Sequence, residues 1–267
     1  MAILEPNRSQ QSGLSTRAAR HGVWVALACV ACIIIWGHHR LELLLLVGFL
    51  APLTVAHVLS MTLVGSVCWG VGVERISIFY GEPLFRFRLG SIPIEVGYLP
   101  TGGSTTFHRT ANVGACRQGV RTYEGLHPWQ RVVVILSGPS LLLLLGYAFV
   151  GGNELLGVLH RFIPTFVSGT MSPGTQGVET LTSYFRFLEQ GDYRIAFGVL
   201  AVVLAAVNLL PLPTLNGGEA VIELVQALSR HRLATKTTMV VRICSLLVAL
   251  AVTASWAFAL VCVLFFR

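Results

Sequence analysis

The chain has 267 residues, of which 54% are hydrophobic and only 12% are charged, and its formal net charge is +7. Soluble domains contain about 25% charged residues, so this composition, with a mean hydropathy of +0.72, excludes a soluble globular domain and a disordered chain alike. The sequence is typical of a mainly helical, multi-pass membrane protein with modest loops.

The basic residues are placed as in a membrane protein rather than in a nucleic-acid-binding one. Most of them are Arg residues that flank apolar segments, and Lys236 is the single lysine. Basic flanks of this kind set the orientation of membrane segments, whereas a nucleic-acid site needs a basic patch or stripe. We therefore expect a lipid bilayer around the chain and no nucleic-acid partner.

About five apolar segments are predicted to cross the membrane as helices of roughly 20 residues each. After a cytoplasmic tail at residues 1–20, the first span lies within 21–40; its apolar run, Val23–Trp36, has no small-residue cleavage site behind it. The other spans are predicted at residues 41–70, 132–150, 195–210 and 240–266. The distribution of Arg among the connecting segments places the N-terminus in the cytoplasm and the C-terminus outside.

The predicted spans divide the chain into a membrane core at residues 41–230 and a C-terminal transmembrane segment at 231–267. The core includes a cytoplasmic loop at 71–130 and an outer loop at 151–193. The outer loop is rich in Ser, Thr, Gly and Pro around 168–175, and we expect it to be flexible.

The cytoplasmic loop carries the signature of a small antiparallel β-sheet. Apolar residues alternate with polar ones in three runs, at residues 76–80, 85–89 and 92–96. A period of two predicts strands. A turn is expected at Gly81–Pro83, and a sharp bend is expected after the sheet at Gly102 and Gly103.

The end of the fourth span is unusually dense in helix-breaking residues. The run from Asn208 to Gly218 contains two prolines and two glycines beside two asparagines, namely Asn208, Pro211, Pro213, Asn216, Gly217 and Gly218. Broken backbone at membrane depth is tolerated only where protein or a water-filled cavity satisfies its polar groups. We therefore expect this segment to face an internal site, the alternative being a plain helix end followed by a turn.

This run resembles the site-2 protease family of intramembrane zinc metalloproteases, which has Asn-x-x-Pro-x-Pro-x-Leu-Asp-Gly-Gly at the end of a core helix. Gly97–Gly103 is similar to the family's Pro-x-Gly-Gly turn, and Ser137-Gly138-Pro139 is similar to the Gly-Pro of its middle core helix. The resemblance covers about residues 43–228. It implies a site-2-protease-like core, with the first and last spans outside it.

The family's second signature, His-Glu-x-x-His, is degenerate in this chain. In the family the two histidines and the Asp of Leu-Asp-Gly bind zinc, and the glutamate is the general base. The matching stretch keeps the first histidine as His57, has Val58 at the general-base position and Met61 at the second histidine, and Asn216 replaces the Asp. All four positions that carry the chemistry in the family are thus accounted for, and only His57 is retained.

The three replacements remove the chemistry that the resemblance implies. Val58 cannot accept a proton, and general bases contribute roughly 100- to 10,000-fold to rates. Met61 offers a soft thioether that suits Cu(I) better than zinc, and Asn216 offers only a neutral carbonyl oxygen. One imidazole with two weak donors is not the three-ligand set of catalytic zinc. We predict no bound cofactor, or zinc if the site is still functional.

Other polar residues are weaker candidates for restoring a site. Glu219 lies one helical turn after Asn216, where a displaced general base is conceivable. The further candidates are acidic residues near the sheet and histidines in loops, namely Glu74, Glu95, His38, His39 and His108. Loop histidines at a membrane interface are the simpler interpretation of the last three. His57 itself is expected to be a buried imidazole that forms a hydrogen bond, with Asn216 as its candidate partner.

Three functions remain open from the sequence. The first is a pseudoprotease that binds or regulates another membrane protein, a single transmembrane segment or an extended peptide without cleaving it. The second is an active intramembrane zinc metalloprotease with an unusual ligand set. The third is a small membrane transport protein, since transporters also have spans interrupted by Gly and Pro, although no pair of related halves is visible here.

Overall fold

The computed structural model describes residues 40–108, 121–229 and 235–266. The predicted tail at 1–20 and almost all of the predicted first span at 21–40 lie outside these residues. The described elements follow in the order α2 (Arg40–Leu63), η1 (Val64–Cys68), β1 (Val73–Leu89), β2 (Ile92–Phe107), η2 (Tyr123–Gly125), α3 (Pro128–Val150), α4 (Gly152–Met171), η3 (Pro173–Gly177), α5 (Val178–Glu189), α6 (Tyr193–Asn208), α7 (Asn216–Ser229) and α8 (Thr235–Phe266).

The described part of the chain has three helices that are long and apolar enough to cross a membrane, at Leu41–Cys68, Pro128–Val150 and Met239–Phe266. They confirm the helices expected at 41–70, 132–150 and 240–266. The segment expected as a span at 195–210 forms the shorter apolar helix Tyr193–Asn208. The total number of spans and the orientation of the termini stay predictions.

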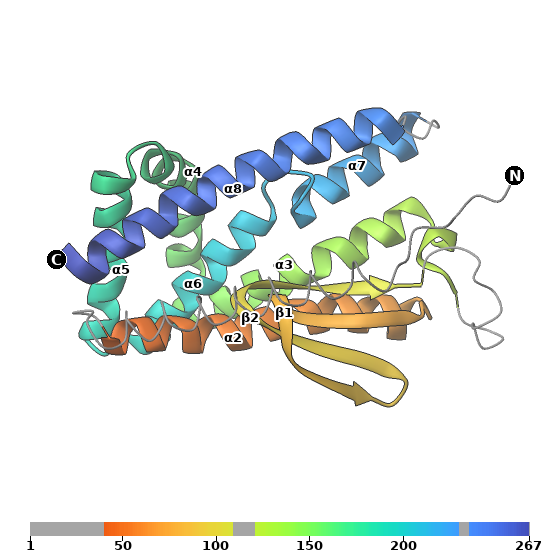
Figure 1. The fold of residues 1–267 in the computed structure, drawn as a ribbon, viewed down its shortest axis with the longest axis horizontal. Coiled ribbons are helices and arrows are strands. Elements are labelled where there is room, and N and C mark those ends of the chain that lie inside the picture. Colours follow the sequence, from red (N-terminus) through yellow and green to blue (C-terminus); the bar gives the residue numbers. More distant parts are fainter. Residues whose placement is uncertain (1–39, 109–120, 230–234, 267) are drawn as a thin grey trace, which may run out of the picture.

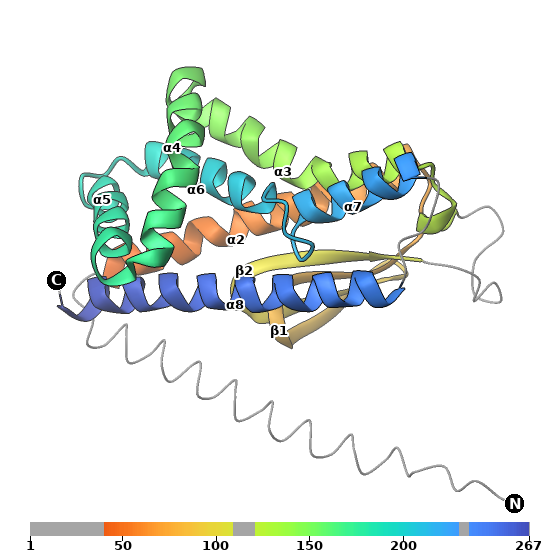
Figure 2. The same cartoon turned by 90° about the horizontal axis from the view of Figure 1, so that it is seen from above.

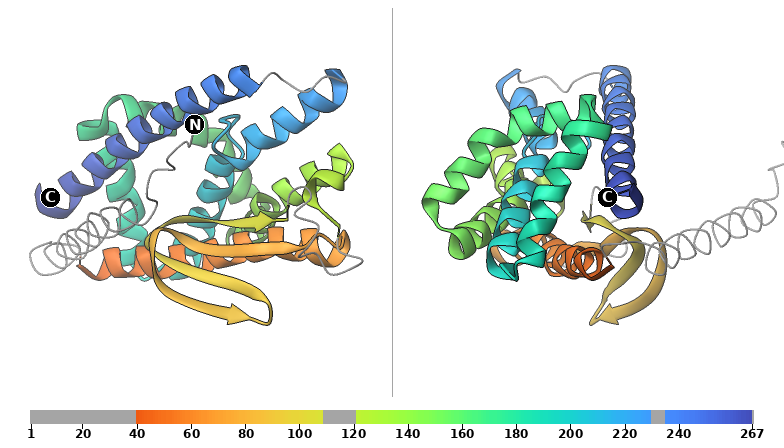
Figure 3. Two further views of the ribbon diagram at one scale, coloured as in Figure 1. Left: turned by 45° about the vertical axis from the view of Figure 1, so that its right-hand side comes forward. Right: turned by 90° about the vertical axis from the view of Figure 1, so that its left-hand side faces the viewer.

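Helix α3 is central to the arrangement and packs against α2, α6 and α7. Its start is defined by Pro128 at the first helical position and by the Gln130 side chain, which accepts a hydrogen bond from the His127 backbone N–H at 2.9 Å. Figure 1 shows α2 and the sheet along one side of α6 and α8 along the other. The left view of Figure 3 shows the same order.

The predicted β-sheet is confirmed, and its two strands are long, bent and antiparallel. The inner segment of β1 at 76–78 pairs on both sides, with 94–96 and with 103–105, while 85–89 pairs with 92–96 in a hairpin that projects from the body (Figure 1). The bend at Gly102, with φ of 153°, lies inside β2 and not after the sheet. The expected position was wrong because pairing resumes beyond the two glycines and continues to Phe107.

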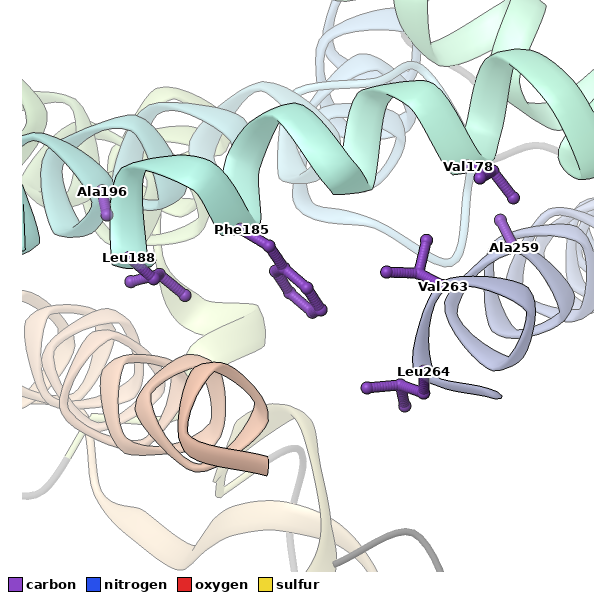
Figure 4. Packing of buried hydrophobic residues seen from close by; sticks show 7 residues of the cluster. All are labelled: Val178, Phe185, Leu188, Ala196, Ala259, Val263 and Leu264. Atoms are coloured by element: carbon purple, nitrogen blue, oxygen red, sulfur yellow. The ribbon is translucent and has the colours of Figure 1, made fainter. Parts of the chain in front are cut away.

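The expectation of a flexible outer loop at 151–193 was wrong. This segment forms α4, the π-helical turn η3 and α5. Helix α5 buries Phe185 and Leu188 in a cluster that includes Val263 and Leu264 of α8 (Figure 4). The cluster lies at the end of the molecule where α4, α5 and the C-terminal end of α8 gather (Figure 2). Burial of this apolar face stabilises the helices despite the nearby Gly and Pro.

An ion pair joins α3 to α7. Arg131 Nη1 lies 3.1 Å from a Glu223 carboxylate oxygen, and the two side chains are only 20% and 14% exposed. Arg131 precedes the site described below by one helical turn on α3, and Glu223 lies two turns after the first residue of α7. The pair therefore fixes the register of α7 against α3.

Replacing Arg131 by Gln is expected to lower the free energy of unfolding by about 1–3 kcal/mol, since a largely buried carboxylate loses its charged partner. Arg86→Gln is the matched control, because Arg86 pairs with Glu95 at 3.3 Å but its side chain is 70% exposed. An exposed pair contributes at most about 1 kcal/mol. Thermal unfolding in detergent measures both variants, and equal losses would contradict this role for Arg131.

Candidate functional site

The side chains at the three predicted ligand positions meet in the structure. The Asn216 amide nitrogen, Nδ2, lies 3.5 Å from His57 Nε2 and 3.4 Å from Met61 Sδ. His57 and Met61 are four residues apart on α2, so they share one face of that helix. Two elements that are distant in sequence, α2 and α7, thus contribute to one polar site.

A third acceptor in this site comes from α3. The Asn216 amide donates a hydrogen bond of 2.7 Å to the backbone carbonyl of Ile135. In a regular helix this carbonyl accepts the N–H of residue 139, but that residue is Pro139, which has no N–H. The proline therefore leaves the Ile135 carbonyl free for Asn216. The sequence contained this signal, because the residue four positions before a helical proline always loses its partner, but the partner on α7 required the fold.

The Pro- and Gly-rich segment positions Asn216 at the start of α7. The chain reverses after α6 and passes over the first turn of α7 (Figure 2). A Cβ atom on Gly217 would lie 2.2 Å from the Leu209 carbonyl oxygen, and one on Gly218 would lie 2.2 Å from that of Leu212. Only glycine permits this backbone approach. Of the other motif residues, Pro211 and Pro213 lie within the reversal, and Asn208 donates to the Leu204 carbonyl at 2.8 Å.

Helix α3 also provides the surface on which the imidazole lies. His57 is only 6% exposed, and a Cβ atom on Gly138 would lie 2.6 Å from His57 Cε1. The other ring nitrogen, Nδ1, is buried and has no hydrogen-bond partner in the described part of the chain. Gly138 and Pro139 therefore act together, since the glycine makes room for the ring of His57 and the proline frees an acceptor for Asn216.

A methyl group at position 138 is expected to displace the His57 ring. Gly138→Ala should lower the free energy of unfolding by about 1–3 kcal/mol through overpacking, although alanine is the better helix former. Gly48→Ala on α2 is the control, because nothing lies within 4 Å of its added Cβ, so this variant should gain up to about 1 kcal/mol. Thermal unfolding of the two variants in detergent tests the difference, and a stabilised Gly138→Ala protein would refute the contact.

Val58, at the predicted general-base position, does not lie among these polar groups. Its side chain is fully buried and packs with Ile76 and Ile94 of the sheet. A Cβ atom on Gly103 would lie 2.8 Å from Val58 Cγ2, so β2 lies directly against α2 at this point. Position 58 is therefore part of an apolar contact between α2 and the sheet.

The backbone carbonyl of Val58 strengthens this contact between α2 and the sheet. It accepts hydrogen bonds from Thr62 Oγ1 at 2.8 Å and from Thr105 Oγ1 of β2 at 3.3 Å. The two hydroxyl groups also lie 2.8 Å apart. The two contacts of Thr105 join β2 to the helix that carries His57.

The other sequence candidates do not gather at the site. Glu95 pairs with Arg75 and Arg86 on the sheet, and Glu74 is exposed on β1. Glu219 lies in the first turn of α7, and His108 directly follows β2. His38 and His39 lie outside the described residues. Within the part of the chain that the structure describes, no three His, Cys, Asp or Glu residues are grouped so that they could hold a metal.

The residues at the site do not fit a catalytic zinc ion. Catalytic zinc uses three strong donors from His, Glu, Asp or Cys together with an open position. Here the candidate donors are one imidazole, one thioether and one neutral amide, and the amide nitrogen, which is not a metal ligand, faces the other two.

The described residues form an apolar helical core with a small sheet, in which the segment after α6 brings Asn216 against α2 and α3. The sequence profile of Peptidase family M50 matches residues 47–252. The match covers most of the chain, which therefore belongs to Peptidase family M50, the site-2 proteases.

One relative shows the same relationship at the level of sequence identity. Over 85 residues the chain is 32% identical to a Chlamydia pneumoniae protein that is named provisionally as a zinc metalloprotease. The match covers 28% of this chain and 14% of the length of that protein.

Proposed function

We propose that this chain is a catalytically inactive member of its family that binds another membrane protein, or a single transmembrane segment, without cleaving it. The observation that carries the proposal is the position of Val58. A side chain that packs between Ile76 and Ile94 supplies no base, and hydrolysis by a metal-bound water needs one. The replacement of two ligand positions by Met61 and Asn216 supports the same conclusion.

The outer part of the sheet supports a role in binding. Phe85, Phe87 and Leu89 on β1 are 66%, 52% and 67% exposed. The segment 85–89 pairs with β2 along one side only within the described residues, so its other side presents unpaired backbone groups. Such an edge can accept an extended peptide by strand addition. An unwound end of a transmembrane segment is a partner of this kind.

A cleavage assay tests the proposal. The purified protein, with zinc added, is incubated in detergent with single-span membrane peptides, and the products are analysed by mass spectrometry. We expect no products beyond those formed with the His57→Ala variant. Products that depend on His57 would show an active metalloprotease and overturn the proposal.

Binding is tested separately in lipid nanodiscs. A fluorescent single-span peptide with an extended juxtamembrane end should transfer energy to a labelled protein. Phe87→Ser should weaken this binding, whereas the exposed Phe258→Ser on α8, far from the sheet in sequence, should not. Equal binding by the two variants would exclude the edge of β1 as the binding surface. A solute flux in liposomes that contain the protein would favour transport instead.

A further inference from the structure

The segment formed by η3 and α5 carries a hollow in the surface of the molecule, at the end where α4, α5 and the C-terminal end of α8 gather (Figure 2). Its volume is about 350 Å³, which lies within the range of small-ligand sites, roughly 300–1,000 Å³. Apart from one glycine, the residues that line it are polar or charged, namely Gly174, Thr175, Glu179, Thr182, Ser183 and Arg186. In a chain that is otherwise so apolar, this lining favours a polar ligand.

The two charged residues of the hollow have opposite signs and are not paired with each other. Glu179 and Arg186 are seven residues apart on α5, so they lie on one face of the helix, about 10 Å apart along its axis. Within the described residues neither side chain takes part in an ion pair. Two unpaired charges of opposite sign at the ends of one polar hollow are complementary to a zwitterionic ligand.

The hollow lies level with the end of the membrane-crossing part of α8. The apolar segment of α8 is Met239–Phe266, 28 residues long, whereas about 20 residues cross the hydrocarbon core of a bilayer. A crossing that begins at the first of these residues, or just after Arg242, therefore ends between Phe258 and Cys262. A Cβ atom on Gly174 would lie 3.7 Å from the Phe258 ring. The hollow is therefore expected at the level of the lipid headgroups.

An apolar stripe leads from the hollow along α8. Leu247, Leu250 and Phe258 are 61%, 57% and 55% exposed, and Ala254 between them is exposed as well. Their spacing of three and four residues places them on one side of the helix. A polar hollow at the level of the headgroups, continued by an apolar stripe at the level of the hydrocarbon, matches a ligand with a polar head and an apolar chain.

We propose that the hollow binds the headgroup of a zwitterionic phospholipid with a primary ammonium group, phosphatidylethanolamine, whose acyl chain lies along the stripe of α8. Arg186 binds the phosphate, since a guanidinium group presents paired N–H donors to phosphate oxygens. Glu179 accepts hydrogen bonds from the ammonium group. The Ser183 hydroxyl donates to the Glu179 backbone carbonyl at 2.9 Å, so its oxygen keeps lone pairs for the same ammonium group.

The test is native mass spectrometry of the full chain in detergent, with phosphatidylethanolamine, phosphatidylcholine or phosphatidylglycerol of one acyl composition added. We expect one phosphatidylethanolamine per chain. Phosphatidylcholine, whose ammonium group has no N–H, and phosphatidylglycerol, which has no cation, should bind about tenfold more weakly. Arg186→Gln and Glu179→Gln should each weaken the retention of phosphatidylethanolamine about tenfold, since each removes a charge-assisted hydrogen bond.

Arg194→Gln and Glu154→Gln are the matched controls. Both positions are exposed, near the starts of α6 and α4, and neither lines the hollow, so both variants should retain the lipid as the parent does. Added phosphatidylethanolamine should also raise the midpoint of thermal unfolding of the parent more than that of Arg186→Gln, because a ligand of the folded state stabilises it.

Two results would overturn the proposal. Equal retention of the three lipids, or retention that neither variant weakens, would show lipid that coats the protein without a site. Displacement of the bound lipid by an equal concentration of soluble glycerophosphoethanolamine would show that the hollow takes a small soluble zwitterion and not a lipid. The inference does not rest on the proposed function, since no residue of the hollow belongs to the polar site at His57.

Discussion

A chain that carries Met61→His and Asn216→Asp together is expected to bind about one zinc ion, whereas the parent chain binds far less. The two histidines would then lie at i and i+4 on α2, and a carboxylate would face them from the start of α7. These are three strong donors of the kind that zinc requires. The present contacts of 3.4 and 3.5 Å around the Asn216 amide show that these positions already meet.

The variant leaves Val58 unchanged so that the contact between α2 and the sheet is preserved. Elemental mass spectrometry of the purified proteins measures the zinc content, and a chelator competition gives the affinity. Met61→Leu with Asn216→Ala, which removes both side-chain donors, is the control and should hold no zinc. A parent chain that already contains stoichiometric zinc would contradict the prediction and the proposed loss of the metal site.

The double variant separates metal binding from catalysis. Because it lacks a base at position 58, it should bind zinc and still fail to cleave peptides. A gain of zinc without a gain of cleavage would show that the metal ligands and the base can be restored independently. Cleavage by the double variant would show that another group, of which Glu219 is the nearest candidate in sequence, accepts the proton.

Much of the sheet and of the site could be predicted because their signals are local. The alternation at Phe85, Phe87 and Leu89 reports a period of two directly. The spacing of His57 and Met61 places both on one helical face. The position of Asn216 opposite them came from the resemblance and not from periodicity, since nothing local in the sequence specifies which helix a reversed segment will meet.

The parts that sequence reasoning missed depend on tertiary contacts. The Gly, Pro and Ser residues of the segment 151–193 predict a loop. In the structure Phe185 and Leu188 of α5 pack against apolar residues of α8, and this burial stabilises a helix there. The direction of the Val58 side chain was also not predictable. The sequence does not specify which face of α2 the sheet will cover. In the structure Ile76 and Ile94 of the sheet pack against Val58, so position 58 faces the sheet rather than the polar site.

Placing a glutamate at the family's general-base position by Val58→Glu is expected to destabilise the protein by about 3–5 kcal/mol without producing peptide cleavage. The new carboxylate would be buried among apolar side chains, Ile76 and Ile94, and an uncompensated buried charge costs several kcal/mol. The larger side chain would also press on β2 at Gly103. A Cβ atom built on Gly103 would lie only 2.8 Å from Val58 Cγ2, so little space separates the two elements. The contact between α2 and the sheet should therefore loosen.

Two control variants separate the charge of the glutamate from its size. Val58→Gln has the same shape without the charge and should lose less stability than Val58→Glu, while Val58→Ala removes only apolar contact and should cost about 2 kcal/mol. Thermal unfolding in detergent ranks the three variants, and protease sensitivity of the sheet shows where the structure opens. If Val58→Glu is as stable as the parent, the carboxylate must reach the polar site beside His57, and the chain would then be one substitution away from regaining a general base.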